Sequence, residues 1–185
     1  MGSVKWTITA FQVDFGDGPK EYLTCVDIER LHKGRGIPVE ALIGVVLQPR
    51  ENPGDPITPD NFRSNIGFIN LLQGLMVEHG EWMDEMRINA DALGNGVLYI
   101  IDERSPKPVE GQEWIVRSDD LIGEFDVKDG EIVPGSYRRN PDFALVNEEG
   151  LFQLTDGIAK TVMVAIENLP DPDDPTPSWD FAQIN

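Results

Sequence analysis

Apolar and polar residues alternate at the start of the chain, in the pattern of a β-strand. Residues 4–10 carry Val, Trp, Ile and Ala at every second position, with lysine and threonine between them. The glycines and proline of residues 16–19 indicate a turn, and residues 22–28 predict a second strand, which together make an antiparallel hairpin. A third strand is predicted over residues 39–47, although its first residues could also begin a short helix.

A long helix is predicted after an irregular connection over residues 49–59, where four prolines remove backbone donors. Thr58 suits the N-cap of this helix, and Pro59 suits its first position. One helical face carries six apolar residues: Phe62, Ile66, Ile69, Leu72, Leu75 and Met76. Gly80 ends or bends this helix, and a second helical stretch is predicted over residues 81–93.

Strand patterns return in the second half of the chain. Residues 97–101 form a compact apolar run that predicts a strand. Residues 121–127 and 131–137 are separated by Lys-Asp-Gly at residues 128–130, which predicts a second hairpin with a tight turn. Sheet is therefore expected in both halves of the chain.

A last helix, capped by Thr155 or Asp156, is predicted to end at Pro170. The elements predict an α+β fold, mainly antiparallel sheet with two hairpins plus additional strands, packed by a central long or kinked helix and a C-terminal helix. Residues 1–169 are expected to form a single globular domain. Residues 170–185 hold four prolines and four aspartates without lysine or arginine, and predict an acidic tail that is disordered or loosely docked.

Charge restricts the possible partners. The chain has 185 residues, a net charge of −18, two histidines and one cysteine. Such a surface repels nucleic acid and anionic membranes, so neither is an expected ligand, and a basic protein partner is favoured. The longest apolar stretches are too short for a transmembrane helix or a signal peptide, which predicts a cytoplasmic protein. Cys25 lies in an apolar strand and is expected to be buried and unreactive.

Motifs for catalysis, metals and cofactors are missing from the sequence. Neither Gly-x-Ser-x-Gly nor Ser-x-x-Lys occurs, and paired carboxylates such as Asp119-Asp120 carry no specificity for acid–base chemistry. The acidic cluster around His79 lacks the spacing of a metal site. No metal and no cofactor are therefore expected, and the leading hypothesis is a non-enzymatic interaction module, an adaptor, regulator or inhibitor that binds a basic partner.

Two polar loops hold the candidate binding residues. Positive charge is concentrated over residues 30–35 of this acidic chain, and the second loop follows the predicted 131–137 strand. The candidates offer arginine and tyrosine groups common at binding sites, and they are Arg30, Lys33, Arg35, Tyr137, Arg138, Arg139 and Asn140. The plainer interpretation is a solvated loop with local ion pairs. Two alternative functions stay open: a small-ligand binder or enzyme with a polar pocket near one of these loops, and a nucleic-acid mimic.

Overall fold

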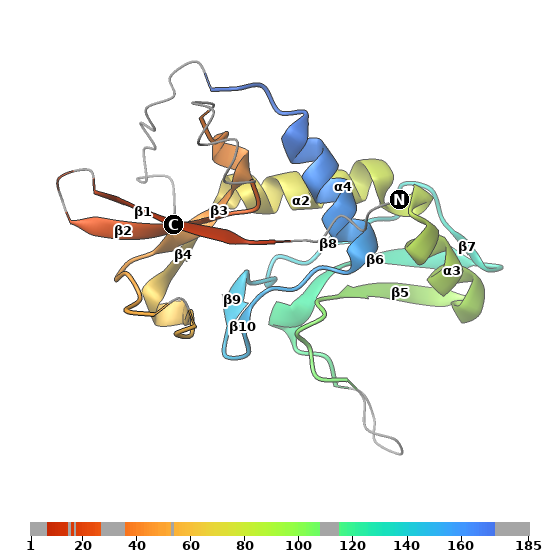
Figure 1. Ribbon diagram of the computed structural model, residues 1–185. Helices are drawn as coiled ribbons and strands as arrows, with labels where there is room; N and C mark the ends of the chain where they lie inside the picture. The colour runs from red at the N-terminus through yellow and green to blue at the C-terminus, as the bar shows by residue number, and fades with distance from the viewer. Residues whose placement is uncertain are drawn as a thin grey trace. The chain divides into compact units, whose positions relative to one another are not determined.

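The computed structural model describes residues 7–14, 16, 18–26, 36–52, 54–107 and 115–172, and their arrangement is an α+β fold with antiparallel sheets (Figure 1). The predicted fold class is thus confirmed. The chain divides into two compact units, unit 1 (Met1–Leu72 with Ala159–Asn185) and unit 2 (Gln73–Ile158). The single domain over residues 1–169 stays a prediction, and so does the tail, because residues 173–185 lie outside the described part of the chain.

Unit 1 contains an antiparallel sheet in the order β1-β2-β3-β4. Its strands are β1 (Thr9–Asp14), β2 (Pro19–Thr24), β3 (Leu42–Val46) and β4 (Phe62–Ser64). The predicted first hairpin is confirmed as β1 and β2, but the predicted bounds were wrong: β1 continues to Asp14, and β2 begins at Pro19 and ends at Thr24. Residues 1–6 and 27–28 are not described. Asp14 shapes the turn, because its Oδ1 accepts the backbone N–H groups of Gly16 at 2.7 Å and Gly18 at 3.2 Å.

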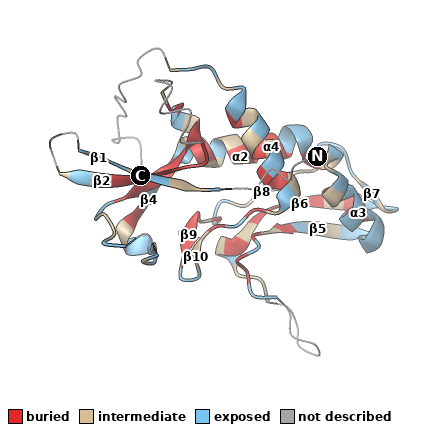
Figure 2. Ribbon diagram, in the orientation of Figure 1, coloured by how far each residue is buried: buried red, intermediate tan, exposed pale blue. Residues whose placement is uncertain are grey.

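The third predicted strand is also confirmed, but only in part. Residues Val39–Ala41 form a 3-10 turn, η1, and β3 follows with every residue buried, as the red segment in Figure 2 shows. Glu21 on β2 is buried too, and the Arg50 guanidinium compensates its charge. Arg50 donates from Nε to Oε2 of Glu21 at 3.0 Å and from Nη2 to Oε1 at 2.5 Å. These bonds from Arg50 hold the pKa of the Glu21 carboxyl below its ordinary value.

Cys25 follows β2 and is buried, as predicted. Its Sγ lies 3.9 Å from the Ala41 carbonyl oxygen, and burial raises the pKa of the thiol to about 12. Because the thiolate is the reactive form, we expect a soluble disulfide reagent at pH about 8 to label the native chain at least about 100-fold more slowly than the chain in denaturant. Release of the coloured thiol measures both rates, and equal rates would show that Cys25 is accessible.

The predicted long helix begins later than expected. Pro59–Asn61 form a 3-10 turn, η2, and Phe62 belongs to β4, so α2 covers only Ile66–His79. Asn65 caps α2: its Oδ1 accepts the Gly67 N–H at 2.9 Å, while its Nδ2 donates to the carbonyls of Val39 and Leu42. Thr58 and Pro59 resemble a helix start, but pairing of β4 with β3 overrides that local preference.

Unit 2 contains a second antiparallel sheet, in which β6 pairs with three other strands. The strands are β5 (Gly96–Ile101), β6 (Leu121–Lys128), β7 (Glu131–Ile132) and β8 (Arg138–Arg139). The predicted second hairpin is confirmed as β6 and β7, but its second arm is two residues long. A small ladder of β9 (Val146–Asn147) and β10 (Gly150–Leu151) follows.

The predicted break after α2 is confirmed in unit 2. Gly80 starts a 3-10 turn, η3 (Gly80–Trp82), and α3 (Asp84–Leu93) follows. Glycine is required at this break, because a Cβ on Gly80 would lie 2.6 Å from Cζ of Phe125 on β6. The C-terminal helix is confirmed as α4 (Asp156–Glu167), and it ends before Pro170. The boundary between the two units falls within α2 and within α4.

Candidate functional site

The first predicted binding loop, residues 30–35, lies outside the described part of the chain. Arg30, Lys33 and Arg35 lie outside the described residues, so their role in binding stays a prediction. The residues of the second loop are all described. They belong to unit 2, at and beside β8.

Tyr137 points inward and contributes to the packing of unit 2. Its hydroxyl donates to Oε1 of Gln73 at 2.5 Å, and the Gln73 amide in turn donates to the Ile122 carbonyl at 3.1 Å. The Tyr137 and Phe125 ring centroids are 5.1 Å apart. Gly123 makes room for the phenol, since a Cβ there would lie 2.4 Å from the hydroxyl oxygen. Burial raises the pKa of Tyr137 above its ordinary value, so this residue is held as a neutral hydrogen-bond donor.

Arg138 and Asn140 are bound to neighbouring groups of the same unit. Arg138 donates from Nε to Glu124 at 2.7 Å and to both oxygens of Asp126 at 2.7 and 2.8 Å, which lowers the pKa of Asp126. Asn140 donates its amide to the carbonyls of Ser118 and Leu121, each at 2.6 Å. Both side chains therefore stabilise the loop itself.

Arg139 differs from its neighbours. It is exposed on β8 opposite Gly123, and no ion pair joins it to a carboxylate within the part of the chain that is described. Arg139 is thus the charged candidate of this loop that has no ion pair among the described residues, and its role in binding stays a prediction. The structure thus assigns Tyr137, Arg138 and Asn140 internal contacts, while their role in binding stays a prediction.

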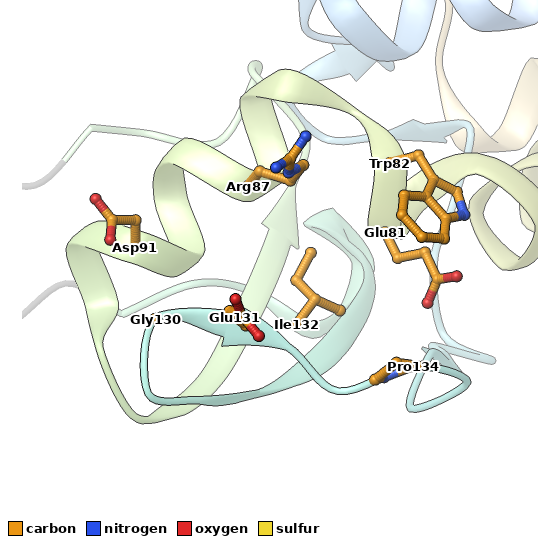
Figure 3. A pocket seen from close by; sticks show the side chains of 8 residues that line it. All are labelled: Glu81, Trp82, Arg87, Asp91, Gly130, Glu131, Ile132 and Pro134. Atoms are coloured by element: carbon orange, nitrogen blue, oxygen red, sulfur yellow. The ribbon is translucent and has the colours of Figure 1, made fainter.

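A pocket of about 480 Å³ lies elsewhere in unit 2, where η3 and α3 meet the β6–β7 hairpin (Figure 3). Its size is within the range of about 300–1,000 Å³ that is typical of ligand sites. The lining residues come from three places in the sequence, and they are Glu81, Trp82, Arg87, Asp91, Gly130, Glu131, Ile132 and Pro134. None of them was among the predicted site residues.

The hairpin turn holds one wall of this pocket in place. Asp129 and Gly130 have φ angles of 53° and 80°, a conformation that fits a tight two-residue turn. The Gly130 N–H donates to the carbonyl of Gly94, just after α3, at 2.6 Å. A Cβ on Gly130 would lie 3.2 Å from Oδ1 of Asp91, so glycine also permits the close approach of turn and helix.

The lining combines negative charge with apolar surface. Three carboxylates, those of Glu81, Asp91 and Glu131, accompany one guanidinium, that of Arg87. Within the described residues no ion pair connects Arg87 to any of these three carboxylates. Trp82, a residue that is 69% exposed, adds an indole. Carboxylates and an indole face are groups that attract cations, so this lining suits binding of a cationic group.

A second polar cluster, also not predicted from the sequence, is buried within unit 2. The side chain of Arg104 is 1% exposed and lies between the fully buried carboxylates of Asp102 and Asp120. Its Nε donates to Oδ1 of Asp120 at 3.0 Å and lies 3.3 Å from Oδ2 of Asp102. Desolvation raises the pKa of Asp102 and outweighs the lowering by the guanidinium.

Backbone groups complete this cluster. Arg104 Nη1 donates to the carbonyls of Leu145 and Gly150, at 3.2 and 2.7 Å, and Nη2 donates to that of Ala144. Asp102 Oδ1 accepts the N–H groups of Arg104 and Gln153, both at 2.9 Å. The guanidinium thereby joins the segment after β5 to the β9–β10 loops, and it is enclosed by protein on all sides. The cluster therefore stabilises the folded state of unit 2.

Within the described ranges, no three His, Cys, Asp or Glu side chains lie close enough to bind one metal ion. No helix in those ranges is both long and apolar enough to cross a bilayer. Comparisons of the chain with protein-family models, with curated proteins and with solved structures find no match.

Proposed function

We propose that this chain is a cytoplasmic, non-enzymatic interaction protein, an adaptor, regulator or inhibitor, that binds a basic partner protein. The pocket between η3, α3 and the β6–β7 hairpin is the proposed centre of that contact. The observation that carries the proposal is its lining, in which three carboxylates accompany a single arginine on a chain of net charge −18.

The internal ion pairs of the chain support this proposal. Arginines are the residues best suited to neutralise carboxylates, and four of them are already bound to carboxylates of the same chain: Arg50, Arg104, Arg117 and Arg138. Within the described residues, no ion pair joins Glu81, Asp91 or Glu131 to a cationic side chain. An unneutralised anionic pocket attracts cations, steers a basic surface during encounter and rejects acidic partners.

An array of peptides of equal length and different net charge tests this function. We expect the full chain to retain the basic peptides, with an affinity that falls at least about 10-fold between about 50 and 500 mM salt, because ions screen the attraction. Retention of neutral or acidic peptides, or an affinity that is independent of salt, would contradict the proposal.

Charge-reversal variants locate the contact. Replacing Glu81, Asp91 and Glu131 together by lysine should weaken the binding of the retained basic peptides at least about 10-fold. The control is a triple variant with the same change in net charge at exposed glutamates outside the pocket, namely Glu51, Glu149 and Glu167. Equal losses in both variants would place the contact outside the pocket.

A further inference from the structure

The one aromatic group among the eight lining residues is the indole of Trp82. The residue is 69% exposed, which leaves a large apolar surface in contact with water. Figure 3 shows Trp82 beside Glu81 on η3, with Pro134 of the chain after β7 across from them and Ile132 between the two walls. An indole face attracts cations, because the ring carries negative charge above and below its plane.

The carboxylates are placed to complement that face. Glu81 extends from η3 on the same side of the pocket as the indole, and Glu131 projects from the hairpin (Figure 3). A guanidinium is planar, so it stacks on an aromatic ring and still directs paired N–H groups at a carboxylate in its own plane. A lysine ammonium can only act as a compact, strongly hydrated charge there.

We infer that this pocket seats an arginine side chain of the basic partner. The inference rests on the proposed function and names the group that the site recognises. The guanidinium stacks on Trp82 and donates to Glu81 and Glu131, while the methylene stem lies along Ile132 and Pro134. Burying that stem against apolar side chains adds to the electrostatic attraction.

A substitution of Arg87 tests whether the ligand is a cation. Its guanidinium also lines the pocket, on the α3 side, and it repels an incoming cation. Arg87→Ala should therefore strengthen the binding of an arginine peptide, by about 2-fold or more. If Arg87 instead holds a carboxylate or phosphate of the ligand, the same change would weaken binding and overturn the inference.

Three blocked tripeptides are the probes: Gly-Arg-Gly, Gly-Lys-Gly and Gly-citrulline-Gly, the last with an uncharged urea in place of the guanidinium. Each is titrated into the isotopically labelled full chain, and the indole N–H signal of Trp82, assigned with Trp82→Phe, is followed by NMR. We expect the arginine peptide to bind at least about 3-fold more tightly than the lysine peptide. The citrulline peptide should leave the signal in place.

Variants separate the indole from general charge. Trp82→Ala should weaken the arginine peptide about 5-fold. Tyr99→Ala is the control, since Tyr99 is 53% exposed on β5 of the same unit and does not line this pocket. Glu131→Gln should also weaken binding, whereas Glu103→Gln, another exposed position of unit 2, should not.

The outcomes distinguish this inference from the proposed function. Basic peptides could bind the chain with the expected salt dependence while Trp82→Ala has no effect, or while lysine and arginine peptides bind equally. In either case the inference of an arginine-binding pocket is wrong and the proposed function stands. If no basic peptide binds at all, both fail.

Discussion

Arg104→Leu is expected to destabilise the protein by about 3–5 kcal/mol, because it removes the cation from a buried pair and leaves two carboxylates without compensation. The Arg104 side chain is 1% exposed, and the side chains of Asp102 and Asp120 are fully buried. Leucine fills part of the space but carries no positive charge to neutralise the two carboxylates. Denaturant unfolding, followed by circular dichroism, measures the loss of free energy.

The pH dependence of that loss identifies its cause. Burial raises the pKa of Asp102 above its ordinary value of 3.8, and the guanidinium partly opposes this shift. A raised pKa in the folded state means that folding becomes less favourable as pH rises through it. Removing Arg104 raises the pKa of Asp102 further, so the loss should be smaller in mildly acidic buffer, at pH about 4.5, than at pH about 7.5.

Arg138→Leu is the matched control. Arg138 also bridges two carboxylates, those of Glu124 and Asp126, but it is 46% exposed, so water can replace its bonds. We expect only a small fraction of the Arg104 effect, with little change between the two pH values. Similar losses for the two variants would mean that burial does not determine how much the Arg104 cluster contributes to the free energy of unfolding.

Gly44→Ala should cost at least about 2 kcal/mol, because a side chain at this position on β3 cannot be accommodated without moving the backbone. The added Cβ would lie 2.3 Å from the Arg63 carbonyl oxygen and 2.4 Å from Cζ of Phe62. Gly44 pairs with Ser64 on β4 and with Leu23 on β2, so the disturbance falls on both neighbouring strands. Guanidinium unfolding measures the change.

Gly74→Ala is the control for that experiment. Gly74 lies in α2, where an added Cβ meets no atom within 4 Å. Alanine favours a helix over glycine by about 0.5–1 kcal/mol, so this variant should be as stable as the wild type or more so. A Gly44→Ala protein of wild-type stability would show that β3 and β4 do not pair in this register.

Local patterns were sufficient to predict most elements of the fold. The two hairpins depend on turn residues beside their strands, and the separation of α2 from α3 depends on Gly80. The predicted start of α2 was wrong, because pairing of β4 with β3 overrides the local helix signal of Thr58 and Pro59. Asn65 is a preferred N-cap residue, and it was the signal that could have corrected the boundary.

The candidate site was less predictable, because it depends on contacts between distant residues. The hydroxyl of Tyr137 bonds to Gln73, 64 positions earlier, and no local pattern distinguishes such a tyrosine from an exposed one. Likewise, Asp91 and Gly130 come together only when α3 packs beside the hairpin. Charge composition predicted a basic partner, which stays a prediction, but it could not show which carboxylates have no ion pair within the described residues.

The Arg104 cluster also affects how unit 2 folds while the chain is being synthesised. Three of the carbonyls that Arg104 binds lie 40 to 46 positions later, and the Gln153 N–H that Asp102 accepts lies 51 positions later. During translation, β5 and Arg104 leave the ribosome while those partners do not yet exist. This part of the chain therefore remains hydrated and incomplete until Gln153 has emerged, and unit 2 cannot reach its final state before then.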